Sequence, residues 1–473
     1  MAKAKEVRIR MYKQGLGDCF LLTFPRTPKP FHMLIDCGAL ASKHYGDAEM
    51  NKIVSDIKKT TGGRLDVLAA THEHWDHTSG FVQAQAVFDE IDVDNVWVAW
   101  TEDPDSEAGK KIRAEFKKRE KAVQMAVARI PDEKRNRQLG LYKKAITEML
   151  GFYGGLGATA AASGGKSRAE KAWDYILNKS TKQYCNPKGQ PLEFDGVKGV
   201  RVYVLGPPEN PEFIRKTLSS KETYDKKGMS LATSFLAAVD DTMLDPETRE
   251  SAFPFEKLHR TTPENARENS FFQTHYGFEE KDKNEWRRID HDWLTVAGEL
   301  ALNIDSYTNN TCLALAIELI DSGKVLLFPG DAQVGNWLSW EELEWKLKDS
   351  DGTTRTVKSD DLLRRTVFYK VGHHGSHNAT LREKGLEKME SPNLVAMIPV
   401  HRLTAQDQAW AFPYPALWTR LKEKARGRVL LADAPDITEI EDEAKKALTE
   451  SEWKSFEKSV TFSDTFVEYR LRF

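Results

Sequence analysis

The sequence predicts an α/β protein in which strands and helices alternate in layers. Apolar runs of strand length alternate with stretches of helix-forming residues near both ends of the 473-residue chain. Hydrophobic residues make up 40% of the chain and charged residues 30%, which is typical of a folded globular protein. This composition excludes a chain that is disordered, collagen-like or coiled-coil throughout.

The N-terminal part of the chain predicts a hairpin followed by alternating strands and helices. Apolar segments at 7–12 and 19–24 flank a turn that contains Gly15 and Gly17. The elements expected after it are a strand at 31–38, a helix at 50–59, a strand at 65–70, a polar loop at 71–79, a helix to about residue 90 and a strand at 93–100.

We expect a single domain over residues 1–473, interrupted by helical insertions at about 104–195, 209–300 and 336–362. A Gly- and Ala-rich stretch at 154–165 predicts a flexible joint within the first insertion. The remaining elements are expected as strands at 200–208, 313–319, 324–328, 366–371, 394–400 and 429–432, and as helices at 340–348, 381–389 and 416–425.

Charge is nearly balanced over the whole chain but not within the first insertion. The 69 Lys and Arg against 72 Asp and Glu give a formal net charge of −3, which excludes a surface that attracts nucleic acid everywhere. Residues 109–145 carry thirteen Lys or Arg and four acidic residues, a net charge of +9. This stretch is either a local site for phosphates or a solvated helix face balanced by acidic patches such as 441–443.

The apolar runs and the cysteines predict a cytoplasmic protein that does not enter a membrane. The longest nearly apolar run, 312–320, contains Glu318 and is too short to span a bilayer, and the first residues hold no apolar signal region. The four cysteines lack the pair spacing of a disulfide framework or a thiolate zinc site. A metal in this protein is therefore expected to be held by His and carboxylate side chains.

Four potential metal ligands lie in the loop that follows the strand expected at 65–70. They are His72, His74, Asp76 and His77, which form the pattern H-x-H-x-D-H. On irregular backbone such a loop can turn its side chains to one point, whereas residues i and i+2 of a helix point apart. Imidazole and carboxylate ligands suit zinc, and also iron or manganese.

Three other expected strands end close to residues of the same kind. Asp36 ends one strand, Asp331 follows the strand at 324–328, and the segment 371–377 follows another and contains three histidines. The loops at the carboxyl ends of strands are where α/β proteins build their sites. We therefore expect these residues to join the H-x-H-x-D-H loop in one site.

Together these motifs resemble the metallo-β-lactamase-fold hydrolase superfamily. The matching positions are Asp36, the loop 72–77, Asp331 and the segment His373-His374-Gly375-Ser376. The strings GLGDCFLL, LIDCG, NNTCLALAIEL, LLFPGDA and YKVGHHGSHN are similar, in this order, to the soluble domain of ComEC-type DNA-uptake proteins. The resemblance touches both halves of the chain and skips the insertions. It implies a four-layer αββα metallo-β-lactamase sandwich with two divalent metals at one edge.

The resemblance also implies roles for individual residues. The implied metal ligands are His72 and His74 for the first metal, Asp76, His77 and His374 for the second, and Asp331 as a bridge between them. Zinc is the expected metal, and manganese is the alternative. His374 is preferred to His373 because related nucleic-acid-cleaving members place the ligand two residues before a serine. Asp36 is expected to orient a ligand imidazole.

Two positions depart from the family's pattern. Between the loop and Asp331, where most members supply one more His, no His lies at an expected strand end, so the first metal would keep an open position. Phe412 precedes Pro413 where the resemblance implies a His-Pro pair, and His401 is the candidate to replace that His.

The expected reaction is hydrolysis by a metal-activated water. The residues expected to be catalytic are Asp36, Asp76 and His373. His373, Asp76 or His377 would supply the proton to the leaving group. The candidate substrate-binding residues are Asn310, Lys370 and Ser376.

The substrate is less determined than the reaction. Nucleic acid or a nucleotide is favoured by the resemblance and by the basic stretch, and Trp75 or Trp100 could stack on bases, whereas Trp97 is expected in the core. Lys370 could contact a phosphate, although a lysine at a strand end is more often exposed to solvent. The alternatives are a hydrolase of lactones, thioesters or amides, and a regulatory subunit that binds partner proteins through the insertions, for example in phage defence.

Overall fold

Two compact units make up the chain in the computed structural model, which describes residues 5–129, 147, 166–216, 261–278, 287, 304–348, 353–408 and 410–473. The first unit consists of Met1–Phe116, Leu150–Gly228 and Asp305–Phe473, and the second of Lys117–Met149 and Met229–Ile304. The described part of the second unit includes α12 (Pro263–Glu268) and α13 (Ser270–Tyr276). The expected joint at 154–165 and the basic residues beyond 129 lie outside the described residues.

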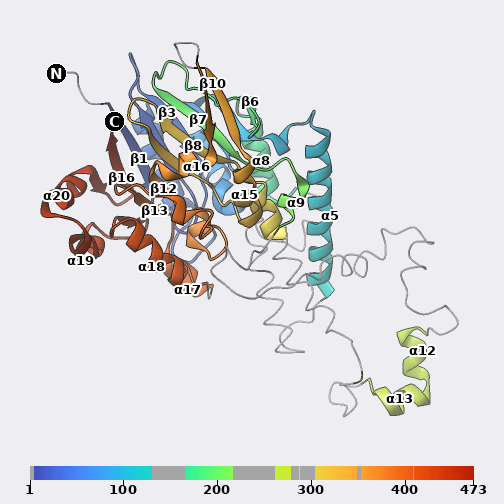
Figure 1. Ribbon diagram of the computed structural model, residues 1–473. Helices are drawn as coiled ribbons and strands as arrows, with labels where there is room; N and C mark the ends of the chain where they lie inside the picture. The colour runs from blue at the N-terminus through green and yellow to red at the C-terminus, as the bar shows by residue number, and fades with distance from the viewer. Residues whose placement is uncertain are drawn as a thin grey trace. The chain divides into compact units, whose positions relative to one another are not determined.

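The first unit is a mixed α/β structure built on two large sheets (Figure 1). The larger sheet has eight strands in the order β15-β16-β1-β2-β3-β4-β5-β6. Its strands are β1 (Glu6–Tyr12), β2 (Phe20–Phe24), β3 (Phe31–Ile35), β4 (Arg64–Ala69), β5 (Asp92–Ala99), β6 (Thr181–Cys185), β15 (Val460–Phe462) and β16 (Phe466–Arg472). Strands β3 to β6 are parallel to one another, and the other neighbours pair antiparallel.

The smaller sheet has six strands in the order β14-β13-β12-β9-β8-β7. Its strands are β7 (Val200–Gly206), β8 (Ala314–Leu319), β9 (Lys324–Phe328), β12 (Thr366–Lys370), β13 (Val395–Ile398) and β14 (Val429–Leu431). Strands β9, β12, β13 and β14 are parallel, and β8 is antiparallel to both of its neighbours. The carboxyl ends of β9 and β12 therefore lie at the same edge of this sheet.

Apolar side chains cover both faces of the central strands. In β3, Met33 and Ile35 belong to a core that also contains residues of the six-stranded sheet, such as Leu326 and Val395. Leu34, between them, points to the other face and packs in a second core with residues of α1 (Asp47–Thr61). This alternation is the period of two that a strand imposes, and it explains why the central strands are nearly continuous apolar runs.

The helices of the first unit are mostly short. They are α2 (Trp75–Thr78), α3 (Gly80–Gln83), α4 (Gln85–Phe88), α5 (Glu107–Arg129, which continues into the second unit), α8 (Arg168–Leu177), α9 (Pro211–Ile214), α15 (Val334–Ser339), α16 (Ser359–Arg364), α17 (Arg402–Asp407), α18 (Pro415–Lys424), α19 (Thr438–Ala447) and α20 (Glu450–Ser459). Short 3-10 turns are η1 (Trp100–Glu102), η6 (Trp340–Glu342), η7 (Gly372–Gly375) and η8 (Leu386–Lys388). No helix in the described ranges combines the length and the apolar character needed to cross a membrane.

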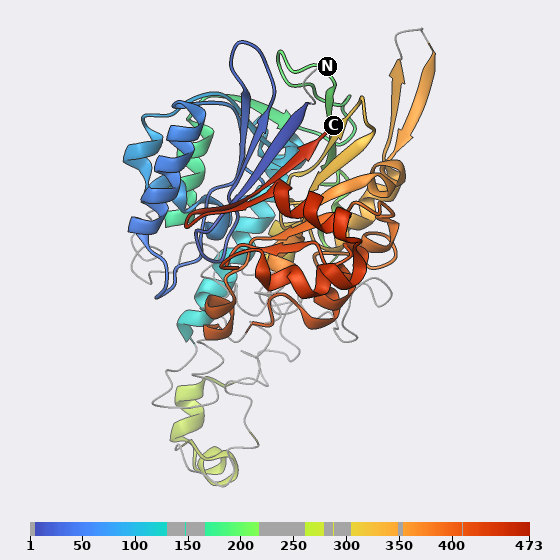
Figure 2. The ribbon, with the colours of Figure 1, turned by 90° about the vertical axis from the view of Figure 1, so that its left-hand side faces the viewer.

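Several sequence expectations are wrong. The helix expected at 340–348 is a 3-10 turn followed by β10 (Glu344–Lys348), which pairs with β11 (Thr354–Lys358) in a separate hairpin, seen in orange in Figure 2. Trp345 and Leu347 are buried between exposed charged residues, which is the alternation of a strand rather than of a helix. The third insertion is therefore not wholly helical. Within the first insertion, β6 pairs with β5, so the end of that segment belongs to the eight-stranded sheet.

Two further differences concern the C-terminal third of the chain. Of the helix expected at 381–389, only the turn η8 is present. Strands β15 and β16, which the sequence analysis did not anticipate, place the C-terminal segment beside β1 in the eight-stranded sheet. The other expected strands agree with the structure to within a few residues.

Candidate metal centre

Loops from both sheets bring the expected metal ligands together. Asp36 and the loop 72–77 follow the parallel strands β3 and β4, while Asp331 follows β9 and His374 follows β12. The side chains that meet there are those of Asp36, His72, His74, Asp76, His77, Asp331 and His374, each at most 4% exposed. Polar side chains that are buried this deeply need hydrogen-bond or ionic partners to offset the loss of water.

Two imidazole nitrogens and two carboxylate oxygens form the centre of this cluster. His77 Nε2 lies 3.0 Å from Asp331 Oδ2 and 3.7 Å from Asp76 Oδ2. His374 Nε2 lies 2.9 Å from Asp76 Oδ2 and 3.9 Å from Asp331 Oδ2. Ligands about 2.0–2.1 Å from a tetrahedral zinc ion are about 3.3–3.4 Å from one another. The four distances scatter around that value, so this set of donors fits a metal ion.

In both His77 and His374, the Nδ1 atom donates a hydrogen bond to an acceptor. His77 Nδ1 donates to Asp36 Oδ2 at 2.8 Å, and His374 Nδ1 donates to the carbonyl oxygen of Pro399 at 2.8 Å. Asp36 also accepts from the backbone N–H and the hydroxyl of Thr71. An imidazole whose Nδ1 carries the proton presents the lone pair of Nε2, which is how metal-binding histidines are oriented.

Several buried polar atoms of the cluster have no hydrogen-bond partner in the described part of the chain. These atoms include His72 Nε2 and Asp76 Oδ1. Buried polar atoms are hydrogen-bonded in the large majority of cases, so such a group needs an explanation. The ring of His72 lies 4.5 Å from that of His74 and 4.2 Å from that of His77, measured between centroids. His72 therefore lies close enough to His74 and His77 to belong to the same polar cluster.

Strained and closely packed backbone supports the cluster. Asp36, His373 and His374 have φ angles of 54°, 44° and 52°, in the left-handed region that residues other than glycine rarely adopt. A side chain at Gly17 would collide with the backbone oxygens of Gly38 and Asp76, so the turn before β2 can press against the metal-ligand loop only with glycine. The structure holds these side chains in place at a cost in backbone energy.

Asp18 belongs to the cluster, although the sequence analysis gave it no role. Asp18, His77, Asp331 and His374 each offer one ligand atom, and all four atoms lie within 4.8 Å of one another. Asp18 also forms an ion pair with Lys370. Asp18 lies just before the amino end of β2. Because β2 is antiparallel to β3, that end lies beside the carboxyl end of β3, which Asp36 follows. The sequence analysis considered only carboxyl ends of strands and therefore missed it.

Lys370 is buried inside the cluster, so the expectation that a strand-end lysine is exposed is wrong here. Its side chain is 1% exposed, and its Nζ contacts Asp18, Asp331 Oδ1 at 3.1 Å and the carbonyl oxygen of Gly330 at 2.8 Å. Burial lowers the pKa of Lys370, but the two carboxylates outweigh it and raise that pKa above its ordinary value. With its ammonium group committed to these partners, Lys370 is not placed to bind substrate.

Oppositely charged neighbours shift the pKa values of His77 and Asp331 in the cluster. Burial lowers the pKa of His77, yet the surrounding carboxylates, Asp331 foremost, raise it well above the ordinary value. Burial raises the pKa of Asp331, yet His77 and Lys370 bring it well below the ordinary value. In each case neighbours of opposite charge outweigh burial and stabilise the charged form, the imidazolium of His77 and the carboxylate of Asp331.

His373 lies beside the centre with its ring oriented differently from that of His374. Its Nδ1 is 3.3 Å from Gln333 Nε2, which donates to it, and 3.2 Å from the hydroxyl of Ser376. Its Nε2 lies 3.9 Å from Asp331 Oδ2. Because Nδ1 accepts, the neutral ring carries its proton on Nε2. This tautomer suits a proton donor, whereas both ring nitrogens of His374 face acceptors, Nδ1 the carbonyl oxygen of Pro399 and Nε2 the carboxylate of Asp76.

A further carboxylate, Asp305, reaches this region through Gln333. Asp305 Oδ2 accepts from Gln333 Nε2 at 3.1 Å and from Asn309 Nδ2 at 3.2 Å. Burial, with a smaller contribution from Asp331 and Asp76, raises the pKa of Asp305 to about 7. Asp305 lies in a helical segment, residues 304–310, ahead of β8, so the search for ligands at strand ends did not point to it.

Other expected substrate contacts have structural partners instead. The amide of Asn310 donates to the carbonyl oxygens of Ile214 and Lys216, and its oxygen accepts from the N–H of Asn336. The hydroxyl of Ser376 donates to Asn378 Oδ1 at 2.9 Å. Asn310 is fully buried, so it supports the loop rather than faces a substrate.

The expected stacking surfaces are also buried. Trp75 is 2% exposed and lies under the guanidinium of Arg168, and Trp100 is 6% exposed and donates to the carbonyl oxygen of Pro207. Neither ring offers a free face to a base, and the expectation that they stack on bases is wrong. Trp97 lies in the core between the sheets, as expected.

The remaining expected histidines lie outside the ligand set. The Phe412 ring, at the position where the resemblance implies a His, lies 5.8 Å from the His373 ring and 6.3 Å from the His374 ring. His401 begins α17, where its Nδ1 accepts from the N–H of Thr404, so it does not replace that His at the centre. The ring of His377 lies 5.8 Å from that of Tyr414.

Comparison with known proteins gives no family assignment. No protein-family model and no curated protein matches the sequence of this chain.

Proposed function

We propose that the protein is a metal-dependent hydrolase of the metallo-β-lactamase fold, a four-layer αββα sandwich, that cleaves phosphodiester bonds in nucleic acid or nucleotides. One observation carries this proposal. His77 Nε2, His374 Nε2, Asp76 Oδ2 and Asp331 Oδ2 converge with the spacing of metal ligands, and the Nδ1 of each imidazole is held by an acceptor. Such buried, converging donors have little structural use without a cation.

Two divalent ions are proposed, zinc by the chemistry of the donors and manganese as the alternative. His77, His374, Asp76 and Asp331 would hold one of them, and His72 and His74 would hold the other together with Asp331. Two such ions would supply a nucleophilic water at neutral pH and stabilise negative charge on a phosphoryl oxygen.

The chain's own residues would perform the remaining tasks. Asp36 would keep the His77 ring in its ligating orientation through the 2.8 Å hydrogen bond to Nδ1. His373 would donate the proton on Nε2 to the leaving oxygen, because Gln333 fixes the tautomer that carries a proton there. Lys370 would compensate the charge of Asp18 and Asp331 rather than contact the phosphate.

A phosphodiester is favoured over other substrates by the resemblance and by the basic residues on α5. In the first unit, the exposed side chains of Lys110 and Lys111 begin the basic stretch. Exposed cations increase affinity for nucleic acid by displacing its counterions, although Lys110 also pairs with Glu107 at 2.6 Å. The alternatives, a hydrolase of lactones, thioesters or amides and a regulatory subunit, have no comparable support among the described residues.

The first experiment measures metal content in the purified full-length protein and in His374→Ala. We expect close to two equivalents of zinc or manganese in the wild type and at least one fewer in the variant. His377→Ala is the matched control, since it removes a histidine of the same segment that lies outside the ligand set. Equal metal content in all three proteins would contradict the proposed ligand set.

The second experiment measures turnover by the metal-loaded protein. Single- and double-stranded DNA, RNA and cyclic nucleotides are the test substrates, with His74→Ala as the inactive control. Turnover of lactone or thioester probes alone would replace the phosphodiesterase by the first alternative. A filled metal site without turnover of any probe would favour the regulatory subunit.

A further inference from the structure

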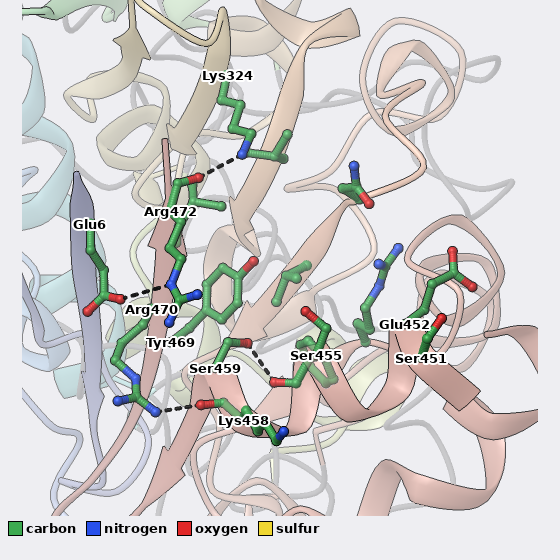
Figure 3. Close-up of a pocket in the computed structure, with 16 residues that line it drawn as sticks. Glu6, Lys324, Ser451, Glu452, Ser455, Lys458, Ser459, Tyr469, Arg470 and Arg472 are labelled. Atoms are coloured by element: carbon green, nitrogen blue, oxygen red, sulfur yellow. Dashed lines mark hydrogen bonds and ion pairs between the residues drawn. The ribbon is translucent and has the colours of Figure 1, made fainter. Parts of the chain in front are cut away.

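A pocket lies at the end of the six-stranded sheet opposite the metal centre. Its lining includes Lys324 at the amino end of β9, Val367 and Val395 at the amino ends of β12 and β13, and Arg428 just before β14. The end of β16 and one face of α20 complete the lining (Figure 3). The metal ligands follow the carboxyl ends of β9 and β12, so the two sites are separated by the length of these strands.

The volume and lining of this pocket are those of a small-molecule site. It encloses about 570 Å³, within the range of about 300–1,000 Å³ that is usual for such sites. Apolar contacts are available from Val367, Val395, Phe456 and Leu471. Ser451, Ser455 and Ser459 are spaced by four residues along α20 and line the pocket, and the hydroxyl of Ser459 donates to the carbonyl oxygen of Phe456.

Arg428 is a buried cation that has no anionic partner in the described part of the chain. Arg428 is only 5% exposed. No described carboxylate oxygen lies within 4.0 Å of its guanidinium nitrogens. Nε donates to the carbonyl oxygen of Ala425, and Nη2 to that of Pro392. Burial lowers the pKa of Arg428. An unpaired buried charge is costly, so an anion at this position would stabilise the protein.

Other donors around the pocket also lack anionic partners. Lys324 donates to the carbonyl oxygen of Arg472 at 2.7 Å, and Arg470 donates to the carbonyl oxygen of Lys458, so both are bonded to neutral groups. The hydroxyl of Tyr469, a residue that is 7% exposed, makes no described hydrogen bond, and burial raises its pKa to about 12. Figure 3 shows the Tyr469 ring between Lys324 and Ser455.

The two acidic residues of the lining already have cationic partners. Glu452 forms an ion pair with Arg426 at 2.8 Å, and Glu6 lies 3.6 Å from Arg472. The four remaining cations of the lining are Lys324, Arg428, Lys458 and Arg470. The pocket therefore presents a surplus of positive charge to whatever occupies it.

We propose that this pocket binds a phosphate-bearing small molecule, with the phosphate against Arg428 and the organic part against the apolar side chains. A phosphate group, with up to two negative charges and three free oxygens, matches several donors on different elements, whereas a carboxylate would satisfy fewer. The pocket is larger than a phosphate ion needs, which favours an ester over free phosphate. The proposal does not depend on the reaction at the metal centre.

The test measures binding of inorganic phosphate, adenosine monophosphate and acetate to the metal-loaded, full-length protein by isothermal titration calorimetry. We expect saturable binding of adenosine monophosphate, weaker binding of phosphate and none of acetate. Arg428→Gln should weaken binding about tenfold to a hundredfold, because a hydrogen bond to a charged group is lost. Lys454→Gln, on the same helix but outside the lining, should change nothing.

Two further variants keep the result unambiguous. Tyr469→Phe removes only a hydroxyl and should weaken binding even if Arg428→Gln does not fold. His74→Ala should retain binding, because the metal centre is at the other end of the sheet. The proposal is overturned by equal binding of acetate, by full binding in both pocket variants, or by binding that His74→Ala abolishes. Equal affinities for phosphate and adenosine monophosphate would identify free phosphate as the ligand.

Discussion

Lys370 and Arg428 are both buried cations of the six-stranded sheet, and they differ in what surrounds them. Lys370, at the carboxyl end of β12, is 1% exposed and contacts the carboxylates of Asp18 and Asp331. Arg428, just before β14, is 5% exposed and bonds only to backbone carbonyl oxygens. Carboxylates of the protein balance the first charge, whereas the second has no carboxylate partner among the described residues.

This difference indicates which kind of ligand each end of the sheet requires. At the carboxyl end, acids outnumber the single lysine, and lone pairs remain for a cation. At the amino end, cations outnumber the acids, and donors remain for an anion. A buried charge is costly unless a partner compensates it, and this is the physical basis of the two proposed ligands, a cation at one end and an anion at the other.

The largest expected effect is that of Lys370→Met. Removing the ammonium leaves Asp18 and Asp331 buried without their cation, so we expect the free energy of unfolding to fall by about 3–5 kcal/mol. Chemical denaturation of the metal-free protein measures this loss. Adding Asp18→Asn to the Lys370→Met variant should recover part of the lost free energy of unfolding. The control is Lys346→Met, at an exposed position of β10. A loss below about 1 kcal/mol would mean that Lys370 is not the counter-ion of this cluster.

The next effect is that of metal removal. A metal at a free concentration of about 100 times its dissociation constant should raise the free energy of unfolding by about 2.7 kcal/mol over the chelated protein. Denaturation with added zinc or with chelator measures the difference. His374→Ala should abolish the increase, while Arg428→Gln should preserve it. An increase that survives His374→Ala would place the metal elsewhere.

A smaller effect is expected from Asp36→Asn. The change weakens the hydrogen bond that orients His77, and such supporting groups contribute about 10- to 100-fold to metal affinity. Competition with a chromogenic chelator gives the affinity. Asp321→Asn, in the exposed turn between β8 and β9, should leave the affinity unchanged. Wild-type affinity in Asp36→Asn would show that the fold alone holds the ring.

The smallest effect is that of Arg428→Met without ligand. Two hydrogen bonds, each about 0.5–1.5 kcal/mol, are lost, but an uncompensated buried charge is removed as well. We expect the free energy of unfolding to change by less than about 1.5 kcal/mol, in contrast to Lys370→Met. Denaturation in a buffer free of phosphate and sulfate measures it. A loss as large as that of Lys370→Met would indicate a counter-ion within the protein and would argue against an anion site.

Much of the central fold could be predicted because the central strands are buried on both faces. Residues 313–319 and 324–328 are nearly continuous apolar runs, and both are strands. The predictions failed where only one face is buried and charges are dense. Residues 344–348 alternate between buried and exposed positions, and their charged residues suggested a helix.

The sequence by itself determined which residue types could form the candidate site, because His and Asp recur at the ends of strands. It also determined the α/β class, because alternating apolar runs and helix-forming stretches pack in layers. Only the tertiary structure decided which residues meet. Asp18 precedes strand β2, and antiparallel pairing of β2 with β3 places that amino end beside the carboxyl end that carries Asp36. The partners of Lys370 and the missing partner of Arg428 were likewise hidden, because ion pairing depends on distance in space and not along the chain.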